Sequence, residues 1–310
     1  MYSDRIDKLF SEQLQNWELA GKNYRDLSKV RVRKIALGGF EVLLQFNPAR
    51  ITSSSAKVDE SHIKQRPCFL CRDNRPKEQK EIPFGDDMII LVNPFPIFRR
   101  HLTIPSRSHT VQRIIGSFGT LLSLSQAMHL YTVFYNGPQA GASAPDHLHF
   151  QAGNIGFMPV EPDFESGRFT KLVSSEPGLE IWKWEGYHRG LISLTGSDEA
   201  KLSSAFTKLF ERLSLLQPER PEPMINILSA YSRDKWTVHI FPRKKHRPEQ
   251  FFSSGADKLL VSPAAVDLGG VIITPREEDF EKISAGDVAD IFSQVCFDDL
   301  EIDKVIKGII

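Results

Sequence analysis

The chain has 310 residues, of which 41% are hydrophobic and 10% aromatic, enough for the folded core of one elaborate domain or two modest ones. Lysine plus arginine and aspartate plus glutamate each number 39, so no overall field attracts the chain to nucleic acid. The N-terminal stretch MYSDRIDKLFSEQLQNW is polar, and no apolar run reaches membrane-spanning length. We therefore expect no nucleic-acid or membrane partner and a cytoplasmic location.

The first half contains patterns of both helices and strands. Apolar residues at helical spacing predict a helix over residues 4–20, and RKIALGGFEVLLQF indicates two strands around a Gly-Gly turn. Apolar strands are expected in DDMIILV and HLTIP, separated by the loop NPFPIF, whose prolines exclude regular ladder pairing. A helix is expected over residues 111–129, before the strand YTVFYN.

A second half begins near Gly190. It contains the helical stretch SDEAKLSSAFTKLFERLSLL, the strands MINILSAY and WTVHIFPRKKH, and a helical end from Glu277. The elements come in bunches, without the alternation of a doubly wound sheet, so we predict an α+β fold built on antiparallel sheet. HLTIPSRSH (101–109) and VHIFPRKKH (238–246) share a pattern that indicates a duplicated unit.

The stretch DHLHFQ contains polar residues at alternating positions. On a strand, His147, His149 and Gln151 share one face, while Leu148 and Phe150 point to the other. The polar outer face of a half-buried strand would have the same alternation. Two imidazoles and an amide are an unusual way to fill such a face, and they favour a functional row.

The loop NGPQAGASAP leads directly into this strand. Small residues such as Gly141 allow backbone N–H groups to approach phosphate oxygens, and Asn136 and Ser143 can add side-chain hydrogen bonds. We therefore predict that the loop binds the phosphates of a substrate.

These residues resemble the histidine-triad superfamily, in particular its transferase branch of galactose-1-phosphate uridylyltransferases, diadenosine tetraphosphate phosphorylases and GDP-hexose phosphorylases. HLHFQA is most similar to the GDP-hexose phosphorylases, and NGPQAGAS to the diadenosine tetraphosphate phosphorylases. HLTIPSRSH and SPAAVDLGGVII extend the resemblance more faintly over most of the chain. The resemblance implies two degenerate histidine-triad-like halves, a catalytic one over residues 1–189 and one over residues 190–310 that completes the substrate pocket.

The resemblance also implies an activity and two catalytic residues. His149 would attack the α-phosphorus of a nucleotide to form a nucleotidyl-histidine, and Gln151 would donate a hydrogen bond to the phosphoryl oxygens. The substrate would be a nucleoside-diphosphate sugar or a dinucleoside polyphosphate, and the acceptor inorganic phosphate or a sugar phosphate. Two alternatives are a hexose-1-phosphate uridylyltransferase and a zinc-stabilised nucleotide-binding module without catalysis.

Cys68 and Cys71 form a C-x-x-C pair that is typical of half a structural zinc site. Two reduced core thiols would show the same spacing, and a redox pair is disfavoured because no thioredoxin-like context surrounds it. The resemblance to uridylyltransferases places the other zinc ligands at His109 and His147, with His101 as a competing fourth ligand.

Several basic and aromatic residues are further candidates for substrate contacts. Arg50 lies where related transferases carry phosphate-binding residues, and Phe95 or Phe98 could stack on a nucleobase or belong to the core. The other candidate phosphate contacts are Ser53–Ser55, Lys57, Arg99, Arg100, Arg243, Lys244, Lys245 and Arg247.

Overall fold

The computed structural model describes residues 2–51 and 60–309, so the candidate contacts Ser53–Ser55 and Lys57 lie outside the described residues. The strands are β1 (Arg31–Leu37), β2 (Phe40–Phe46), β3 (Glu81–Phe84), β4 (Met88–Val92), β5 (Leu102–Pro105), β6 (Tyr131–Asn136), β7 (His149–Asn154), β8 (Thr170–Glu176), β9 (Leu179–Trp184), β10 (Ile192–Gly196), β11 (Ile225–Ser232), β12 (Lys235–Pro242) and β13 (Val271–Thr274). The α-helices are α1 (Tyr2–Asn16), α2 (Glu18–Asp26), α4 (Glu60–Gln65), α5 (Phe118–Ala127), α6 (Val160–Glu165), α7 (Glu199–Leu216), α8 (Glu249–Phe252), α9 (Ala265–Leu268), α10 (Glu277–Lys282), α11 (Ala285–Val295) and α12 (Asp299–Ile306). Short 3-10 helices are η1 (Leu27–Lys29), η2 (Pro48–Arg50), η3 (Arg72–Asn74) and η4 (Gly255–Asp257).

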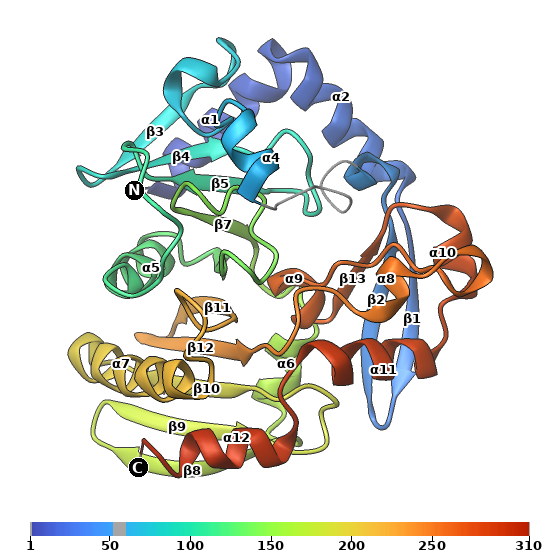
Figure 1. Cartoon of the computed structure of the whole chain (residues 1–310). Coiled ribbons are helices and arrows are strands. Elements are labelled where there is room, and N and C mark those ends of the chain that lie inside the picture. The colour runs from blue at the N-terminus through green and yellow to red at the C-terminus, as the bar shows by residue number, and fades with distance from the viewer. Residues whose placement is uncertain (1, 52–59, 310) are drawn as a thin grey trace.

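Ten strands form one antiparallel sheet in the order β3-β4-β5-β7-β6-β11-β12-β10-β9-β8 (Figure 1). The strands β3 to β7 and β8 to β12 have the same internal order, and each set has one long helix, α5 or α7, before its last two strands. The two sets meet at the β6–β11 pair, where Asn136 lies opposite Asn226. The predicted α+β fold of two degenerate repeats on antiparallel sheet is therefore confirmed.

The large sheet is covered on both faces. Residues such as Ile104, Phe150 and Ile240 pack in one hydrophobic cluster with α5 and α7, while Phe134 and Leu228 point to the other face and pack in a second cluster. The second cluster also contains apolar residues of the small sheet β1-β2-β13. Figure 1 shows α5 and α7 on one side of the large sheet and the small sheet with α10 and α11 on the other.

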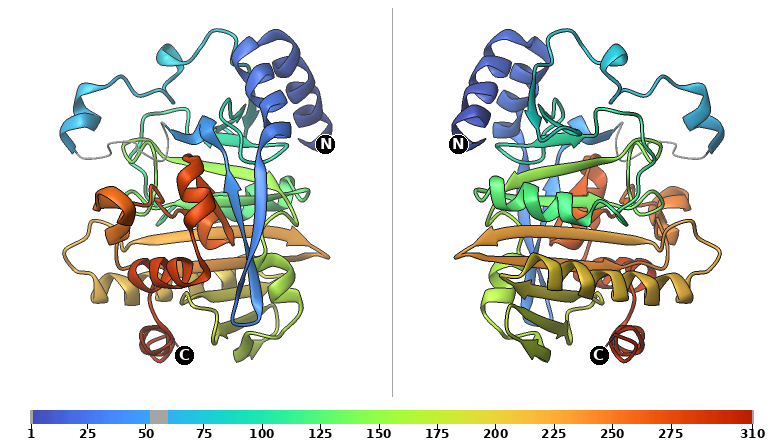
Figure 2. Two further views of the ribbon diagram at one scale, coloured as in Figure 1. Left: turned by 90° about the vertical axis from the view of Figure 1, so that its right-hand side faces the viewer. Right: turned by 90° about the vertical axis from the view of Figure 1, so that its left-hand side faces the viewer.

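The small sheet combines strands that are far apart in the sequence. β1 and β2 form the predicted hairpin, whose turn residues Gly38 and Gly39 have φ of 55° and 113°, a region that favours glycine. β13 then pairs with β2 in parallel. The N-terminal helices lie near the β3 end of the large sheet and α12 near its β8 end (Figure 2).

Two predicted helices differ from the observed ones. The helix expected over residues 111–129 begins only at Phe118, because the preceding segment is held in an irregular path by the hydrogen bonds of the Gln112 side chain. The helix expected over residues 4–20 is interrupted at Trp17, whose backbone is extended and whose side chain is buried.

The sequence echo that indicated a duplication joins two strands that do not correspond. HLTIP is β5, the third strand of its set, whereas VHIFP is part of β12, the fifth strand of the other set. The structural counterpart of β5 is β10. The second set also begins at Thr170, before the boundary expected at residue 190.

No helix in the described ranges combines the length and the apolar character that crossing a bilayer requires.

Candidate active site

Two adjoining cavities lie over the large sheet beside β7. The larger, of about 420 Å³, is lined by His149 and by apolar residues that include Trp17 and Phe95. The smaller, of about 80 Å³, is lined by both polar and apolar residues, among them His246 and Arg247. Arg50, Ser143 and Gln151 line both cavities and thus mark their junction.

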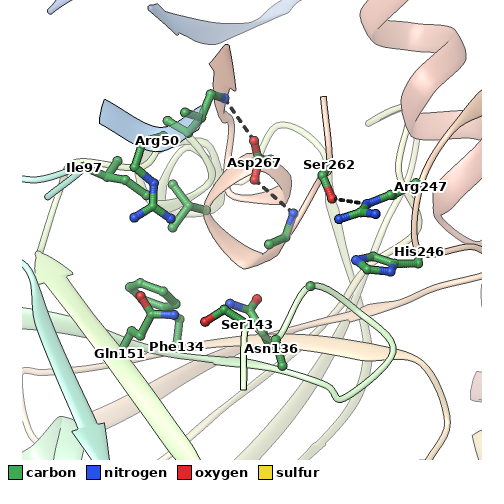
Figure 3. Close-up of a pocket in the computed structure, with 15 residues that line it drawn as sticks. Arg50, Ile97, Phe134, Asn136, Ser143, Gln151, His246, Arg247, Ser262 and Asp267 are labelled. Atoms are coloured by element: carbon green, nitrogen blue, oxygen red, sulfur yellow. Dashed lines mark hydrogen bonds between the residues drawn. The ribbon is translucent and has the colours of Figure 1, made fainter. Parts of the chain in front are cut away.

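The smaller cavity draws its residues from both halves of the chain. Figure 3 shows Arg50 on one side and His246 and Arg247 on the other, with Gln151 and Ser143 on the side of the large sheet. Asp267 of α9 lies opposite them. Residues after 190 therefore contribute to the pocket that contains Gln151.

His149 is the first residue of β7 and only 2% of its surface is exposed. Its Nδ1 lies 2.8 Å from the carbonyl oxygen of His147, which places a proton on Nδ1 and leaves the lone pair on Nε2. Nε2 has no hydrogen-bond partner in the described part of the chain. Burial lowers the pKa of His149 to about 4, so the ring is neutral at neutral pH. Such an imidazole is a nucleophile with a free nitrogen.

The backbone of His149 is held by the buried side chain of Gln112. The backbone N–H of His149 donates to Oε1 of Gln112 at 2.7 Å, and Nε2 of Gln112 donates to the His149 carbonyl at 3.1 Å. Nε2 also donates to the carbonyl of Asn136 in β6 at 2.9 Å. Gln112 thus holds the first residue of β7 against the last residue of β6. Nothing in its local sequence indicated this role.

Gln151 lies on the same strand and is oriented by the buried His101. The backbone N–H of Ile97 donates to Nδ1 of His101 at 3.2 Å, so the proton of the neutral ring is on Nε2. Nε2 then donates to Oε1 of Gln151 at 2.9 Å. Burial, together with the nearby Arg50, lowers the pKa of His101 to about 3 and keeps the ring neutral. With its oxygen so engaged, Gln151 has its amide N–H groups available to the cavity.

The structure places the predicted substrate contacts Asn136, Gly141, Ser143 and Arg50 around the smaller cavity. The Asn136 Oδ1 is already engaged, because it accepts hydrogen bonds from Asn226 Nδ2 and from the Ala265 backbone, each at 2.8 Å. Gly141 has a φ of 98°, and a Cβ there would lie 2.7 Å from that of Ala264. Part of the role of both residues is therefore packing.

Arg50 remains cationic in this partly buried position. Burial lowers its pKa to about 10, and its Nη1 donates to the carbonyl of Phe95 at 2.9 Å. A second arginine, Arg66, lines the larger cavity and donates to the carbonyl of Ser143 at 2.8 Å. The sequence does not mark Arg66 or Trp17 as a substrate contact, because neither belongs to a motif that indicates phosphate or nucleobase binding.

Cys68, Cys71, His109 and His147 form one group, whose ligand atoms lie within 4.8 Å of one another. The Cys68 Sγ is 3.3 Å from the His147 Nδ1, and the Cys71 Sγ is 3.1 Å from the His109 Nδ1. The His147 Nε2 is 2.8 Å from the Ser106 carbonyl and carries the proton, so Nδ1 offers its lone pair to the group. These four residues can hold a metal ion. His101 lies apart from them, against Gln151.

The other candidates divide into pocket and structural residues. Phe95 lines the larger cavity, whereas Phe98 is fully buried against Phe134 and Phe157. Arg100 forms an ion pair with Asp7, and neither Arg99 nor Arg100 lines the two cavities.

The basic run after β12 divides in the same way. Arg243 is buried and donates to Asn226 and to four backbone carbonyls, while Lys244 and Lys245 pair with glutamates. Arg247, which donates to Ser262 Oγ at 2.9 Å, is the residue of this run that reaches the smaller cavity as a cation.

Two solved structures of yeast Ap4A phosphorylase Apa2 are similar to the whole chain. The complex with Ap4A matches with a TM-score of 0.60 and 17% identity over 90% of this chain and 96% of that chain. The complex with AMP matches with a TM-score of 0.58 and 20% identity over 92% of this chain and 97% of that chain. At these identities the likeness shows the fold alone, so the chain shares the fold of the Apa2 structures.

Two family models together match most of the chain. Residues 9–154 match a domain of unknown function, DUF4922, and residues 164–310 match the GDPGP1-like C-terminal domain. No curated protein sequence matches the chain. The resemblance to the phosphorylases of the histidine-triad superfamily is borne out in fold by the Apa2 structures and, over the C-terminal half, by the GDPGP1-like domain.

Proposed function

We propose that the protein is a nucleotidyltransferase of the phosphorylase type that forms a covalent nucleotidyl-His149 intermediate. The observation that carries this proposal is the buried, neutral His149, whose Nε2 has no hydrogen-bond partner among the described residues and which lines the cavity beside Gln151. A nucleophile needs such a free lone pair. A nucleoside-diphosphate sugar is the preferred substrate class, because HLHFQA is most similar to the GDP-hexose phosphorylases and the C-terminal half matches the GDPGP1-like domain.

The two cavities suit the two parts of such a substrate. Trp17, Phe69 and Phe95 give the larger cavity an aromatic and apolar lining that suits a nucleoside. Arg50 and Arg247 give the smaller cavity the positive charge that phosphates require. The α-phosphate would then lie at the junction, beside Gln151 and Ser143.

The first step forms a bond between the His149 Nε2 and the α-phosphorus and breaks the bond from that phosphorus to the bridging oxygen. The leaving group departs as a sugar phosphate or, from a dinucleoside polyphosphate, as a nucleotide. The His149 ring becomes positively charged, and its Nδ1–H donates to the His147 carbonyl, 2.8 Å away. The amide of Gln151 and the guanidinium of Arg50 would bind the phosphoryl oxygens as their charge grows.

In the second step an oxygen of the acceptor attacks the same phosphorus and the nitrogen–phosphorus bond breaks. The electron pair of that bond returns to the His149 Nε2, and the ring is neutral again. With inorganic phosphate as the acceptor the product is a nucleoside diphosphate. Gln151 cannot act as a general base, so in our proposal it favours transfer over activation of water.

We propose that Cys68, Cys71, His109 and His147 hold a structural zinc ion. Two thiolates and two imidazoles are a ligand set that zinc prefers, and the Ser106 carbonyl orients His147. The ion would tie the loop at residues 68–71 to the residues just before β7 and take no part in the reaction. This ligand set also supports the alternative of a hexose-1-phosphate uridylyltransferase, since the sequence resemblance to that branch includes the same four positions.

The experiment is a turnover assay with three substrates. GDP-glucose and Ap4A are each incubated with inorganic phosphate, and UDP-glucose with galactose 1-phosphate, and the products are separated by chromatography. We expect GDP and glucose 1-phosphate from the first mixture. ADP and ATP from the second would change the substrate class within the proposal, whereas UDP-galactose from the third would favour the uridylyltransferase alternative.

His149→Ala should abolish turnover, and the matched control His129→Ala, at an exposed position, should not. If no mixture reacts but the protein binds nucleotides, the alternative of a catalytically inactive binding module holds and our proposal is wrong.

A further inference from the structure

A third cavity, of about 220 Å³, lies in the second set of strands. Its position follows from the registers. The first residues of β6 and β11 pair with the last residues of β7 and β12, as Tyr131 with Asn154 and Ile225 with Pro242. Likewise Leu102 pairs with Ala152 where Ile192 pairs with Ile240.

Asn154 of β7 thus corresponds to Pro242 of β12, and Ala152 to Ile240. Counting back along the two strands, Thr237 corresponds to His149 and His239 to Gln151. Thr237 and His239 both line the third cavity, together with Leu228 and Ala230 of β11. The cavity is therefore the counterpart of the active site in the second half. A threonine in place of the nucleophile excludes the chemistry that we propose for His149.

His239 presents a hydrogen-bond donor to this cavity. The Trp184 Nε1–H donates to the Ser193 Oγ at 2.8 Å, and the same Oγ lies 2.8 Å from the His239 Nδ1. Ser193 is fully buried and its hydroxyl hydrogen has no other acceptor among the described residues, so we assign the hydroxyl as the donor to Nδ1. The proton of the neutral ring is then on Nε2, for which no hydrogen bond is found among the described residues. His239 is only 4% exposed, so a buried N–H group is left for a ligand or water.

The opposite wall supplies acceptors and an aromatic ring. Glu161 of α6 accepts hydrogen bonds from the Thr132 hydroxyl and from the Met158 backbone N–H, and Glu165 lies exposed at the end of the same helix. The Phe164 ring is 5.2 Å from the His239 ring, at 71° to it. No lysine or arginine is among the described residues that line this cavity.

This lining discriminates between ligand classes. Two carboxyl groups without a cation repel an anion, which excludes the phosphates that the first site takes. The His239 N–H would point its positive end at a cation. An uncharged polyol suits both sides, because its hydroxyl groups accept from His239 and donate to the carboxylates, while its C–H face packs on Phe164.

We propose that this cavity binds an uncharged polyhydroxylated ligand of monosaccharide size. At about 30 Å³ per water molecule, the cavity has room for roughly seven waters, which is space for one hexose ring. The proposal does not depend on the reaction at His149, since the two sites share no residue.

Saturation-transfer NMR with D-glucose, D-mannose and D-galactose tests this proposal. We expect at least one hexose to bind with a dissociation constant on the order of 1 mM. Ala230→Phe, which fills the cavity, should weaken binding at least tenfold, and Glu165→Ala, at an exposed position, should weaken it severalfold without affecting folding. Ser143→Phe, a matched substitution at the active site, should leave hexose binding unchanged.

Three outcomes would overturn the proposal. One is that none of the hexoses gives a signal at a concentration on the order of 10 mM. Another is that the signal is the same in the folded Ala230→Phe and Glu165→Ala variants. The last is that Ser143→Phe, and not Ala230→Phe, removes the signal, because the hexose would then occupy the active site.

Discussion

His149 and Gln151 owe their properties to partners that the motif does not contain. The alternation of His147, His149 and Gln151 was enough to predict that the three share a strand face. The proton on the His149 Nδ1 and the orientation of Gln151 come from a backbone carbonyl and from His101. His101 lies 50 residues before Gln151 in the sequence, where its position suggested only a competing metal ligand.

We predict that His101→Phe lowers kcat about tenfold to a hundredfold and changes KM much less. Without the His101 N–H, the oxygen of Gln151 has lost its donor and the amide can turn away from the phosphoryl group. His101→Gln, which can both accept and donate, should restore part of the activity. Steady-state kinetics of each variant measures these effects.

A double variant shows whether His101 acts through Gln151. The variant His101→Phe with Gln151→Ala should be no slower than Gln151→Ala alone, because the residue that His101 orients is already absent. If the double variant instead lost activity by the product of the two single-variant factors, the two residues would act independently and this positioning role would be wrong.

Arg189 is a buried cation to which the described part of the chain offers no hydrogen bond. All three of its guanidinium nitrogens lack a partner among the described residues, and the guanidinium packs on the rings of Tyr187 and Phe292 at 4.1 and 4.6 Å. Burial lowers its pKa. The unfolded chain hydrates this charge, whereas the folded chain does not.

We therefore predict that Arg189→Met leaves the free energy of unfolding unchanged or raises it by about 1 kcal/mol, since methionine fills similar volume without a charge. Chemical denaturation measures this difference, with the exposed Arg168→Met as control. A loss of more than about 2 kcal/mol would show that the cation–π contacts outweigh the desolvation.

At the scale of elements, the loop around Cys68 and Cys71 is connected to the residues before β7 through His147. If the four-residue group binds zinc, metal analysis should find about one zinc ion per chain. Cys68→Ser and His109→Ala should lose the metal and lower the unfolding temperature by several degrees.

Two control variants sharpen this prediction. Cys296→Ser, at a buried cysteine outside the group, should keep the metal. His101→Ala should keep it too, because the structure places His101 against Gln151. An unchanged zinc content in Cys68→Ser would contradict the zinc proposal.

A buried carboxyl group connects the segment before α5 to β6. The backbone N–H of Ile114 and the hydroxyl of Tyr135 both donate to Glu222, each at 2.7 Å. Burial raises the pKa of Glu222 from 4.5 to about 7. Between these values the folded chain holds a proton that the unfolded chain has released, so this contribution to stability falls as the pH rises from 4.5 to 7.

We predict that Glu222→Gln removes this dependence. Between pH 5 and pH 8 the wild type should lose on the order of 3 kcal/mol more unfolding free energy than the variant. Parallel denaturation curves at the two pH values give this difference directly. Equal losses in the two proteins would show that Glu222 is ionised throughout.

Most strands could be predicted from the sequence, but the breaks in the two predicted helices could not. Apolar runs and glycine turns identify β1, β2 and β6, because neighbouring residues in the sequence are enough to determine these strands. The break at Trp17 and the irregular segment around Gln112 have distant causes, namely the lining of the larger cavity and the backbone of β7. Local periodicity cannot register such contacts.

At the scale of the whole molecule, two sets of five strands share one sheet, and the candidate site combines residues of the first set with residues that follow the second. His149 and Gln151 come from the first set, whereas Arg247 and Asp267 come from the chain that follows the second. The sequence indicated a duplication, but from an echo between strands that do not correspond. The true correspondence, of β7 with β12, has little residue identity and is visible only in the strand order and registers.

The covalent intermediate is the central claim, and peptide mapping by mass spectrometry tests it most directly. The protein is incubated with GDP-glucose, UDP-glucose or Ap4A without an acceptor, kept from acid, digested and analysed. We predict a peptide that contains His149 and is heavier by one nucleoside monophosphate residue, absent in His149→Ala and discharged when the acceptor is added. Turnover by a protein that carries no such adduct, or an adduct on another residue, would contradict the account.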